Sequence, residues 1–141
     1  MHSIDMQMID NTVSDGWWKA LTAHFVRPGA ALELRCWREE TEEIRAASRY
    51  GAPVPEGGEV VVKGTVTQAL LRELQAEQPA DKSLYNKMTK YFTLCAAAEG
   101  CLFTGAHYGT EIYIQGVSEA DLAWFRQTIA PYRAAFSIRE T

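Results

Sequence analysis

The fold is decided by the stretch Tyr91–Glu140, which reads YFTLCAAAEGCLFTGAHYGTEIYIQGVSEADLAWFRQTIAPYRAAFSIRE. Its pattern predicts a strand, a tight turn, a strand, a second turn, a strand, a helix and a short strand. Glu99-Gly100 is a two-residue hairpin turn by composition. Ser118, followed three residues later by Asp121, is typical of a helix N-cap. The stretch therefore predicts an antiparallel sheet that carries a helix, and it holds no catalytic or binding signature.

Further strands are expected before this stretch. Residues 31–38 alternate between apolar and polar side chains, which is typical of a half-buried strand, and Trp37 lies opposite the apolar face. Residues 59–63 form a short run rich in β-branched side chains and predict another strand. The two prolines and two glycines within residues 52–58 predict a loop between them.

Three helices are also expected in this region. The first follows Ser14, and the second begins at the acidic residues 39–43, which suit the N-terminal end of a helix dipole. The third is amphipathic and is predicted to end at Pro79. The polar residues 80–88 fit either a loop or one irregular helical turn.

Length and composition indicate one globular domain. The chain has 141 residues, of which 47% are hydrophobic and 23% charged, and both fractions are ordinary for a folded domain. No repeat or linker divides it. We predict an α+β domain over residues 14–141, after an N-terminal arm over residues 1–13. The expected architecture is an antiparallel sheet of four to six strands with three or four helices packed mainly on one face.

Charge and hydropathy argue against nucleic acid and membranes as partners. The formal net charge is −4, and no run of Lys or Arg is present, whereas nucleic-acid binding draws most of its affinity from a basic patch. No segment approaches the length of about 20 apolar residues that a membrane span needs. The N-terminal residues lack the positive charge and apolar run of a signal peptide. We therefore expect a cytoplasmic protein that binds neither nucleic acid nor membrane.

The cysteines and histidines do not form a recognisable metal or nucleophile motif. Cys36, Cys95 and Cys101 show no zinc-type spacing, and an odd number of cysteines favours reduced thiols, with a Cys95–Cys101 disulfide as the alternative. A reactive thiolate would need His24 or His107 beside it. Gly57-Gly58 precedes a strand rather than a helix, so it does not suit a phosphate loop. No cofactor and no metal is expected.

A small enzyme or a ligand sensor remains the alternative hypothesis. Its weak candidate residues are His107, Glu111, Tyr113 and Cys101, which cluster on two strands that are adjacent in sequence. Glu111 and Tyr113 share one strand face, so both could line a pocket. In that case His107 should lie in a concave site.

The leading hypothesis is a non-enzymatic protein-interaction domain of the adaptor, inhibitor or immunity-protein type. Trp17 and Trp18 are neighbours and should not both enter one core seam, and two more indoles lie off the predicted core faces. Exposed aromatic side chains are enriched at protein interfaces, and an acidic patch suits a basic partner. The predicted surface, for a protein partner or for self-association, comprises Trp37, Trp124, His107, Tyr108, Glu39, Glu40, Glu42 and Glu43.

Overall fold

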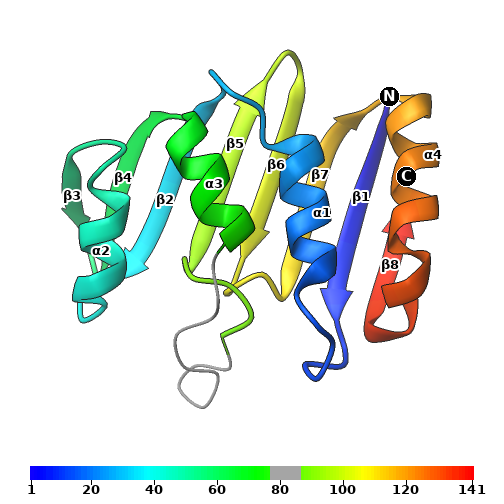
Figure 1. Ribbon diagram of the computed structural model, residues 1–141, viewed down its shortest axis with the longest axis horizontal. Helices are drawn as coiled ribbons and strands as arrows, with labels where there is room; N and C mark the ends of the chain where they lie inside the picture. The colour runs from blue at the N-terminus through cyan, green and yellow to red at the C-terminus, as the bar shows by residue number, and fades with distance from the viewer. Residues whose placement is uncertain (77–86) are drawn as a thin grey trace.

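The computed structural model describes residues 1–76 and 87–141 (Figure 1). The strands are β1 (His2–Met8), β2 (Ala31–Trp37), β3 (Pro53–Glu56), β4 (Glu59–Thr65), β5 (Thr93–Ala98), β6 (Cys101–Ala106), β7 (Glu111–Val117) and β8 (Phe136–Glu140). The helices are α1 (Gly16–Phe25), α2 (Thr41–Ala47), α3 (Gln68–Ala76), α4 (Glu119–Ile129) and the 3-10 helix η1 (Ala130–Ala135). The expected helix stop at Pro79 and most of the ambiguous segment 80–88 lie outside the described residues.

The strands form one antiparallel sheet in the order β3-β4-β2-β5-β6-β7-β1-β8. In Figure 1, β3 lies at the left-hand edge and β8 at the right-hand edge. The α+β class and the antiparallel sheet are confirmed, but the sheet has eight strands rather than four to six.

The two strands beyond six come from segments that were expected to be an arm and a loop. The segment expected as an N-terminal arm contains β1, which lies between β7 and β8. The segment expected as a loop over residues 52–58 contains β3, an edge strand that pairs only with β4 among the described residues. Its prolines are tolerated because an edge strand has a free side where no N–H is needed.

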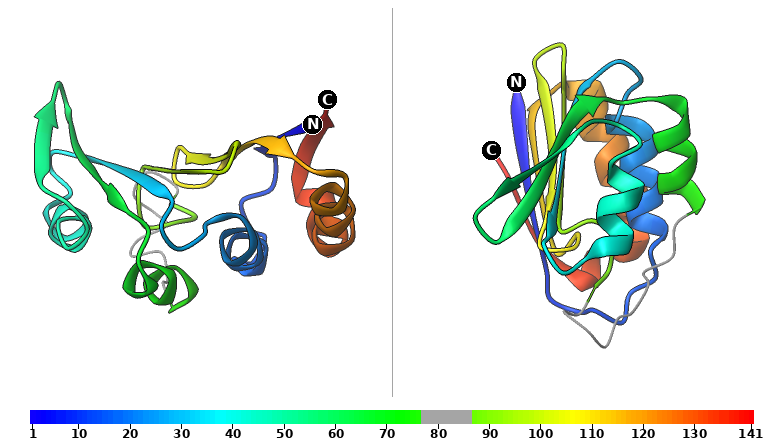
Figure 2. Two further views of the ribbon diagram at one scale, coloured as in Figure 1. Left: turned by 90° about the horizontal axis from the view of Figure 1, so that it is seen from above. Right: turned by 90° about the vertical axis from the view of Figure 1, so that its left-hand side faces the viewer.

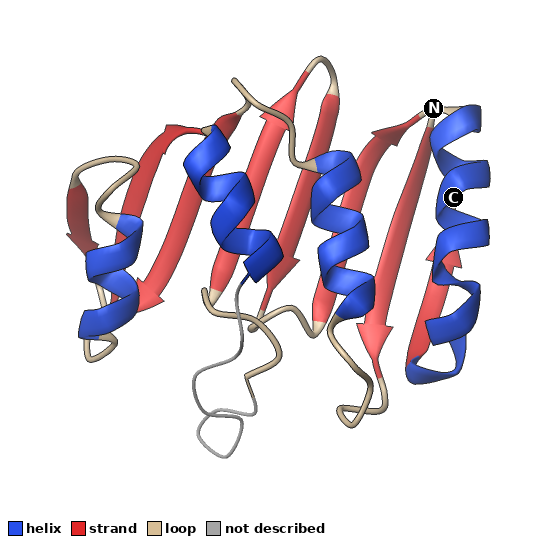
Figure 3. Ribbon diagram, in the orientation of Figure 1, coloured by secondary structure: helices blue, strands red, loops and turns tan. Residues whose placement is uncertain are grey.

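The four α-helices lie together on one side of the sheet, as the view from above shows (Figure 2, left; Figure 3). A row of residues in register across the covered face forms the centre of the core, and it comprises Leu32, Ala96, Phe103, Ile114 and Ile4. Each of them is buried. This burial removes apolar surface from water and is the main force that holds helices to sheet.

Trp17 and Trp18 both enter the core, contrary to the expectation from their adjacency. They are 0% and 2% exposed. Trp17 packs edge-on against Phe136 of β8, with ring centroids 5.0 Å apart. Trp18 packs over β6, where a Cβ at Gly105 would lie 2.8 Å from its ring. Both rings can be buried under one helix because Trp17 reaches β8 and Trp18 reaches β6.

The local signals in the decisive stretch are confirmed. Glu99 and Gly100 both have positive φ, 51° and 79°, which is the conformation of a two-residue hairpin turn. The side chain of Ser118 accepts a hydrogen bond from the N–H of Asp121 and caps α4.

Candidate functional site

The face of the sheet away from the helices, here called the open face, carries the candidate site. In the described part of the chain no helix covers it (Figure 2, left). One row of residues in register crosses it from β4 to β8, and this row comprises Lys63, Glu33, Cys95, Thr104, Tyr113, Asp5 and Arg139. Both ends of the row are charged, and its centre is uncharged.

The charges at each end of the row are paired with one another. On one side, Arg35 Nε donates to Glu33 Oε2 at 2.7 Å, and Lys63 Nζ lies 4.0 Å from Glu33 Oε1. The hydrogen bond to Glu33 raises the pKa of Arg35 above its ordinary value. On the other side, Arg139 Nη2 lies 3.5 Å from Asp5 Oδ2. The open face therefore presents little uncompensated charge.

Two shallow hollows lie near the ends of the row. One, of about 150 Å³, is lined by Tyr113, Asp5 and Arg139 together with neighbours on β1 and Thr141. The other, of about 320 Å³, lies on the hairpin of β3 and β4 and includes Val54 and Lys63. Val54 is 56% exposed and Tyr113 43% exposed, so each hollow has an apolar or aromatic side chain at its surface.

An aromatic cluster, defined by Trp37, Phe92, His107 and Tyr108, lies where β2 ends and β5 begins. Phe92 is its centre, and its ring centroid lies 4.7 Å from that of Trp37, 5.4 Å from His107 and 5.2 Å from Tyr108. The structure thus brings together three of the four aromatic residues proposed for binding. Phe92 was missed because nothing in its local sequence distinguishes it from a core residue.

The members of the aromatic cluster differ in exposure. The side chain of His107 is 60% exposed, and Trp37 is half-buried. Tyr108, which we expected on an exposed hairpin tip, is only 4% exposed. His107 and Tyr108 both have positive φ, 50° and 57°, and this left-handed pair turns Tyr108 inward against Phe92. Trp37 and His107 therefore retain accessible area, as does the half-buried Phe92, whereas Tyr108 does not.

The acidic residues at the start of α2 divide into two pairs. Glu39 and Glu42 are exposed, as expected of a contact patch. Glu40 is buried, and its Oε2 lies 2.5 Å from Nζ of Lys87, while Glu43 Oε1 lies 3.7 Å from the same atom. Burial acts to lower the pKa of Lys87, but the hydrogen bonds and charges of Glu40 and Glu43 together outweigh it, and the pKa is raised.

The partners of Glu40 indicate a structural role. Its Oε1 accepts a hydrogen bond of 2.8 Å from the N–H of Trp37. Its other oxygen holds Lys87, whose Nζ lies 5.1 Å from the centroid of the Tyr108 ring. Glu40 therefore ties α2 to the aromatic cluster and is not accessible to a basic partner.

Trp124 lies apart from the aromatic cluster, on the helix layer. Its ring stacks on His24 of α1, with centroids 3.7 Å apart and planes 9° from parallel. His24 Nε2 lies 2.9 Å from Asp121 Oδ1, and this hydrogen bond lowers the pKa of Asp121. Trp124 is half-buried and joins α4 to α1, so it does not contribute to the open face.

The four residues of the enzyme hypothesis do not form one site. His107 Nδ1 contacts Glu111 Oε2, and Tyr113 shares the open face with Glu111. Cys101 begins β6, whereas His107 follows the end of that strand, so the two lie on the order of 15–20 Å apart. Cys101 also packs against the core on the covered face.

The thiols are unsuited to nucleophilic chemistry. Cys36 is buried beneath the helices, and burial raises its pKa to about 12. Burial also raises the pKa of Cys95 and of Cys101. All three cysteines are free. Cys95 lies on the open face and Cys101 on the covered face, so a disulfide between them would require rearrangement of the hairpin.

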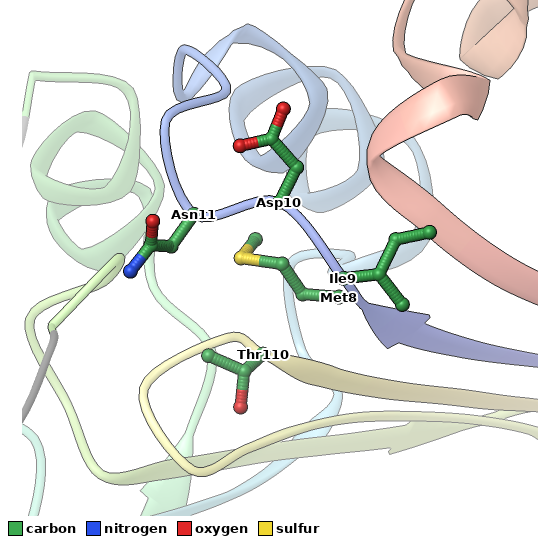
Figure 4. Close-up of a pocket in the computed structure, with 5 residues that line it drawn as sticks. All are labelled: Met8, Ile9, Asp10, Asn11 and Thr110. Carbon is green, nitrogen blue, oxygen red and sulfur yellow. The ribbon is translucent and has the colours of Figure 1, made fainter.

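A third hollow, of about 430 Å³, lies beside the end of β1 and is lined by Met8, Ile9, Asp10, Asn11 and Thr110 (Figure 4). Asp10 is the single titratable side chain among these five. Its Oδ1 accepts hydrogen bonds from the hydroxyl and the N–H of Thr12, at 2.6 and 3.0 Å, and these bonds lower its pKa. The hollow therefore lacks an acid–base pair.

Neither a metal centre nor a membrane span is found in residues 1–76 and 87–141. No three His, Cys, Asp or Glu side chains of this part converge closely enough to hold a metal ion. None of its helices combines the length and the apolar character needed to cross a bilayer. Comparison with protein-family models, with curated proteins and with solved structures finds no match to this chain.

Proposed function

We propose that the protein is a non-enzymatic protein-interaction domain that docks a partner protein on its open face. The observation that carries this proposal is the uncharged centre of an eight-stranded sheet that no helix of residues 1–76 and 87–141 covers on this side. A large uncovered surface with aromatic and apolar side chains is a common mark of an interface.

The chemistry of the open face suggests what kind of partner it accepts. Its charged side chains already pair within the face, so a strongly charged partner would gain little from them. Cys95 and Thr104 at the centre have small side chains, so a flat surface of a partner protein could approach the sheet closely. Tyr113 supplies aromatic contact area. We infer a partner protein with a near-neutral, largely apolar contact surface.

Trp37 and His107 extend this surface along the strand direction, where β2 and β6 end. Trp37 lies on the same face of β2 as Glu33, and His107 lies beyond β6 beside Phe92. Both retain exposed area, whereas Tyr108, Glu40 and Glu43 support them from within. The proposal therefore keeps Trp37 and His107 as contact residues.

A cytoplasmic location is part of the same proposal. It rests on three free thiols, one of them on the open face, which a reducing compartment would preserve. An enzymatic role is less well supported, because Cys101 lies at the opposite end of β6 from His107 and Glu111.

The experiment compares substitutions on the two sides of the sheet. A photo-crosslinking residue in place of Thr104 identifies the partner in cells that express the protein, and the purified pair is then measured by calorimetry. Thr104→Arg should weaken binding by about tenfold or more, because it puts a charge at the centre of the interface. Ala123→Arg, on the exposed side of α4, is the matched control and should leave affinity within about twofold.

Two results would overturn the proposal. In one, Thr104→Arg binds like the wild type; in the other, Ala123→Arg is the variant that loses affinity, which would put docking on the helix layer. Each variant is first checked for a native circular dichroism spectrum and a cooperative thermal transition.

A further inference from the structure

The two edges of the sheet are built differently, and the β3 edge is closed to further strands. The turn at Gly57-Gly58 has two residues, so Glu56 and Glu59 form the hydrogen-bonded pair that flanks it. Alternation along β3 then directs the main-chain nitrogens of Pro53 and Pro55 away from β4. These are the positions where an incoming strand would need N–H donors, and proline has none.

The β8 edge carries no such protection. Ser3 and Thr141 exchange N–H···O bonds of 2.9 and 3.0 Å, so alternate residues of β8, Arg139 and Ser137, also face β1. Phe136, Ile138 and Glu140 therefore direct their main-chain groups outward. The N–H of Phe136 is bonded to the carbonyl of Arg133. Within the described residues, no strand pairs with this outer side.

We propose that β8 pairs with β8 of a second copy of this chain, antiparallel and centred on Ile138, to extend the sheet across a dimer. This goes beyond docking on the open face and uses a different surface. Ile138 and its counterpart would exchange both N–H···O bonds. The N–H of each Glu140 would donate to the carbonyl of Phe136 in the other copy, which is still free to accept.

The side chains of β8 are compatible with this register. On the open face, Arg139 would lie opposite Ser137 of the second copy, so like charges do not meet. On the covered face, Glu140 would lie opposite Phe136. The Glu140 carboxylate is already held by Arg126, with Nη2 to Oε1 at 2.6 Å, so its methylene groups are what it offers to the ring.

A second copy suits this edge better than an unrelated extended peptide. In the register centred on Ile138 each copy offers the other the same outward groups, so a two-fold axis perpendicular to the sheet satisfies both strands equally. That axis keeps both helix layers on one side and joins the two open faces into one surface.

The first test is sedimentation velocity over a range of protein concentrations, which should show a monomer–dimer equilibrium for the wild type. Ile138→Pro removes the central outward N–H but leaves the β1 ladder intact, and it should weaken dimerisation roughly tenfold or more. Ile138→Val is the matched control, because it keeps the N–H, and it should dimerise like the wild type. A wild type that stays monomeric throughout overturns the proposal, as does a dimer that Ile138→Pro does not weaken.

A second pair of variants tests the register and does not depend on how well Ile138→Pro folds. Ser137→Glu would face Arg139 of the other copy and should strengthen the dimer about threefold, whereas Ser137→Arg should weaken it by a similar factor. If both variants change the dimer in the same direction, or neither changes it, the Ile138-centred pairing is wrong.

The failure of this proposal and that of the docking proposal can be told apart. Thr104→Arg should weaken partner binding without changing the dimer. Ile138→Pro should weaken the dimer while each chain keeps its affinity for the partner.

Discussion

The two faces of the sheet are made by alternate residues of the same strands, yet one face is buried and the other is open to solvent. On β6, Phe103 is fully buried beneath α1, while the next residue, Thr104, lies at the centre of the open face. On β7, Ile112 and Ile114 are buried, and Tyr113 between them is 43% exposed. The strand period alone therefore separates a core from a surface. The helix layer decides which of the two faces becomes the core. Four experiments test how strictly the covered face and the open face differ.

The largest effect is expected at the centre of the covered face. Phe103→Ala removes a fully buried ring that contacts Trp18 and Phe25, and it should lower the free energy of unfolding by about 3–5 kcal/mol. Thr104→Ala, its neighbour on the open face, should change it by less than about 1 kcal/mol. Urea unfolding followed by tryptophan fluorescence measures both. Similar losses for the two variants would mean that the open face is also covered.

The second effect concerns thiol reactivity on the two faces. The pKa of Cys36 is raised to about 12 from 9.0, so near pH 8 its thiolate fraction is about a thousandfold below that of an ordinary thiol. Cys95 on the open face is only partly buried. In the native protein, iodoacetamide should modify Cys95 at least about a hundredfold faster than Cys36. Peptide mass spectrometry over time would reveal the order, and equal rates would contradict the burial of Cys36.

The third effect comes from close packing of helix on sheet. A Cβ at Gly105 would lie 2.8 Å from two carbons of the Trp18 ring, so Gly105→Ala should lower the free energy of unfolding by about 1–3 kcal/mol. Ala97→Val on the open face adds more volume, but it should change stability by less than about 0.5 kcal/mol. Thermal denaturation of both variants gives the comparison. A neutral Gly105→Ala would show that α1 can move away from β6.

The smallest effect tests what joins the helices of the covered face to one another. The hydrogen bond from His24 lowers the pKa of Asp121 from 3.8. A lowered carboxyl pKa contributes stability above 3.8, and this contribution disappears as the pH falls through the folded-state value. Asp121→Asn should therefore be less stable than the wild type by about 0.5–1 kcal/mol at pH 7, and the difference should be smaller at pH 3. Urea unfolding at both pH values measures this, and a pH-independent difference would refute the mechanism.

The elements that the sequence predicted best are those with complete local signals. The hairpin at Glu99-Gly100 and the Ser118 cap need only a few adjacent residues, and both are present. β1 has a signal too, since Ile4, Met6 and Met8 alternate with polar residues, but no turn or aromatic residue marked it as a strand. β3 was hidden by its two prolines, which are signs of a loop unless the segment is known to lie at an edge.

The candidate site could be predicted only in part, because it depends on strand order. Asp5 and Arg139 are neighbours on the open face through β1, which enters the sheet between β7 and β8. No local pattern carries that information. Likewise, the inward turn of Tyr108 depends on Phe92 and Lys87, which come from a different part of the chain. The aromatic residues were visible in sequence, but their exposure was not.

The insertion of β1 between β7 and β8 has a consequence for synthesis of the chain. His2–Met8 is synthesised well before both of its neighbours, since Gln7 pairs with Glu111 on one side and with Ser137 on the other. At roughly 5–20 residues per second, β1 waits on the order of ten seconds before it can pair. During that time its apolar side chains have no native partner strand, and so nascent β1 is a segment that a chaperone could protect.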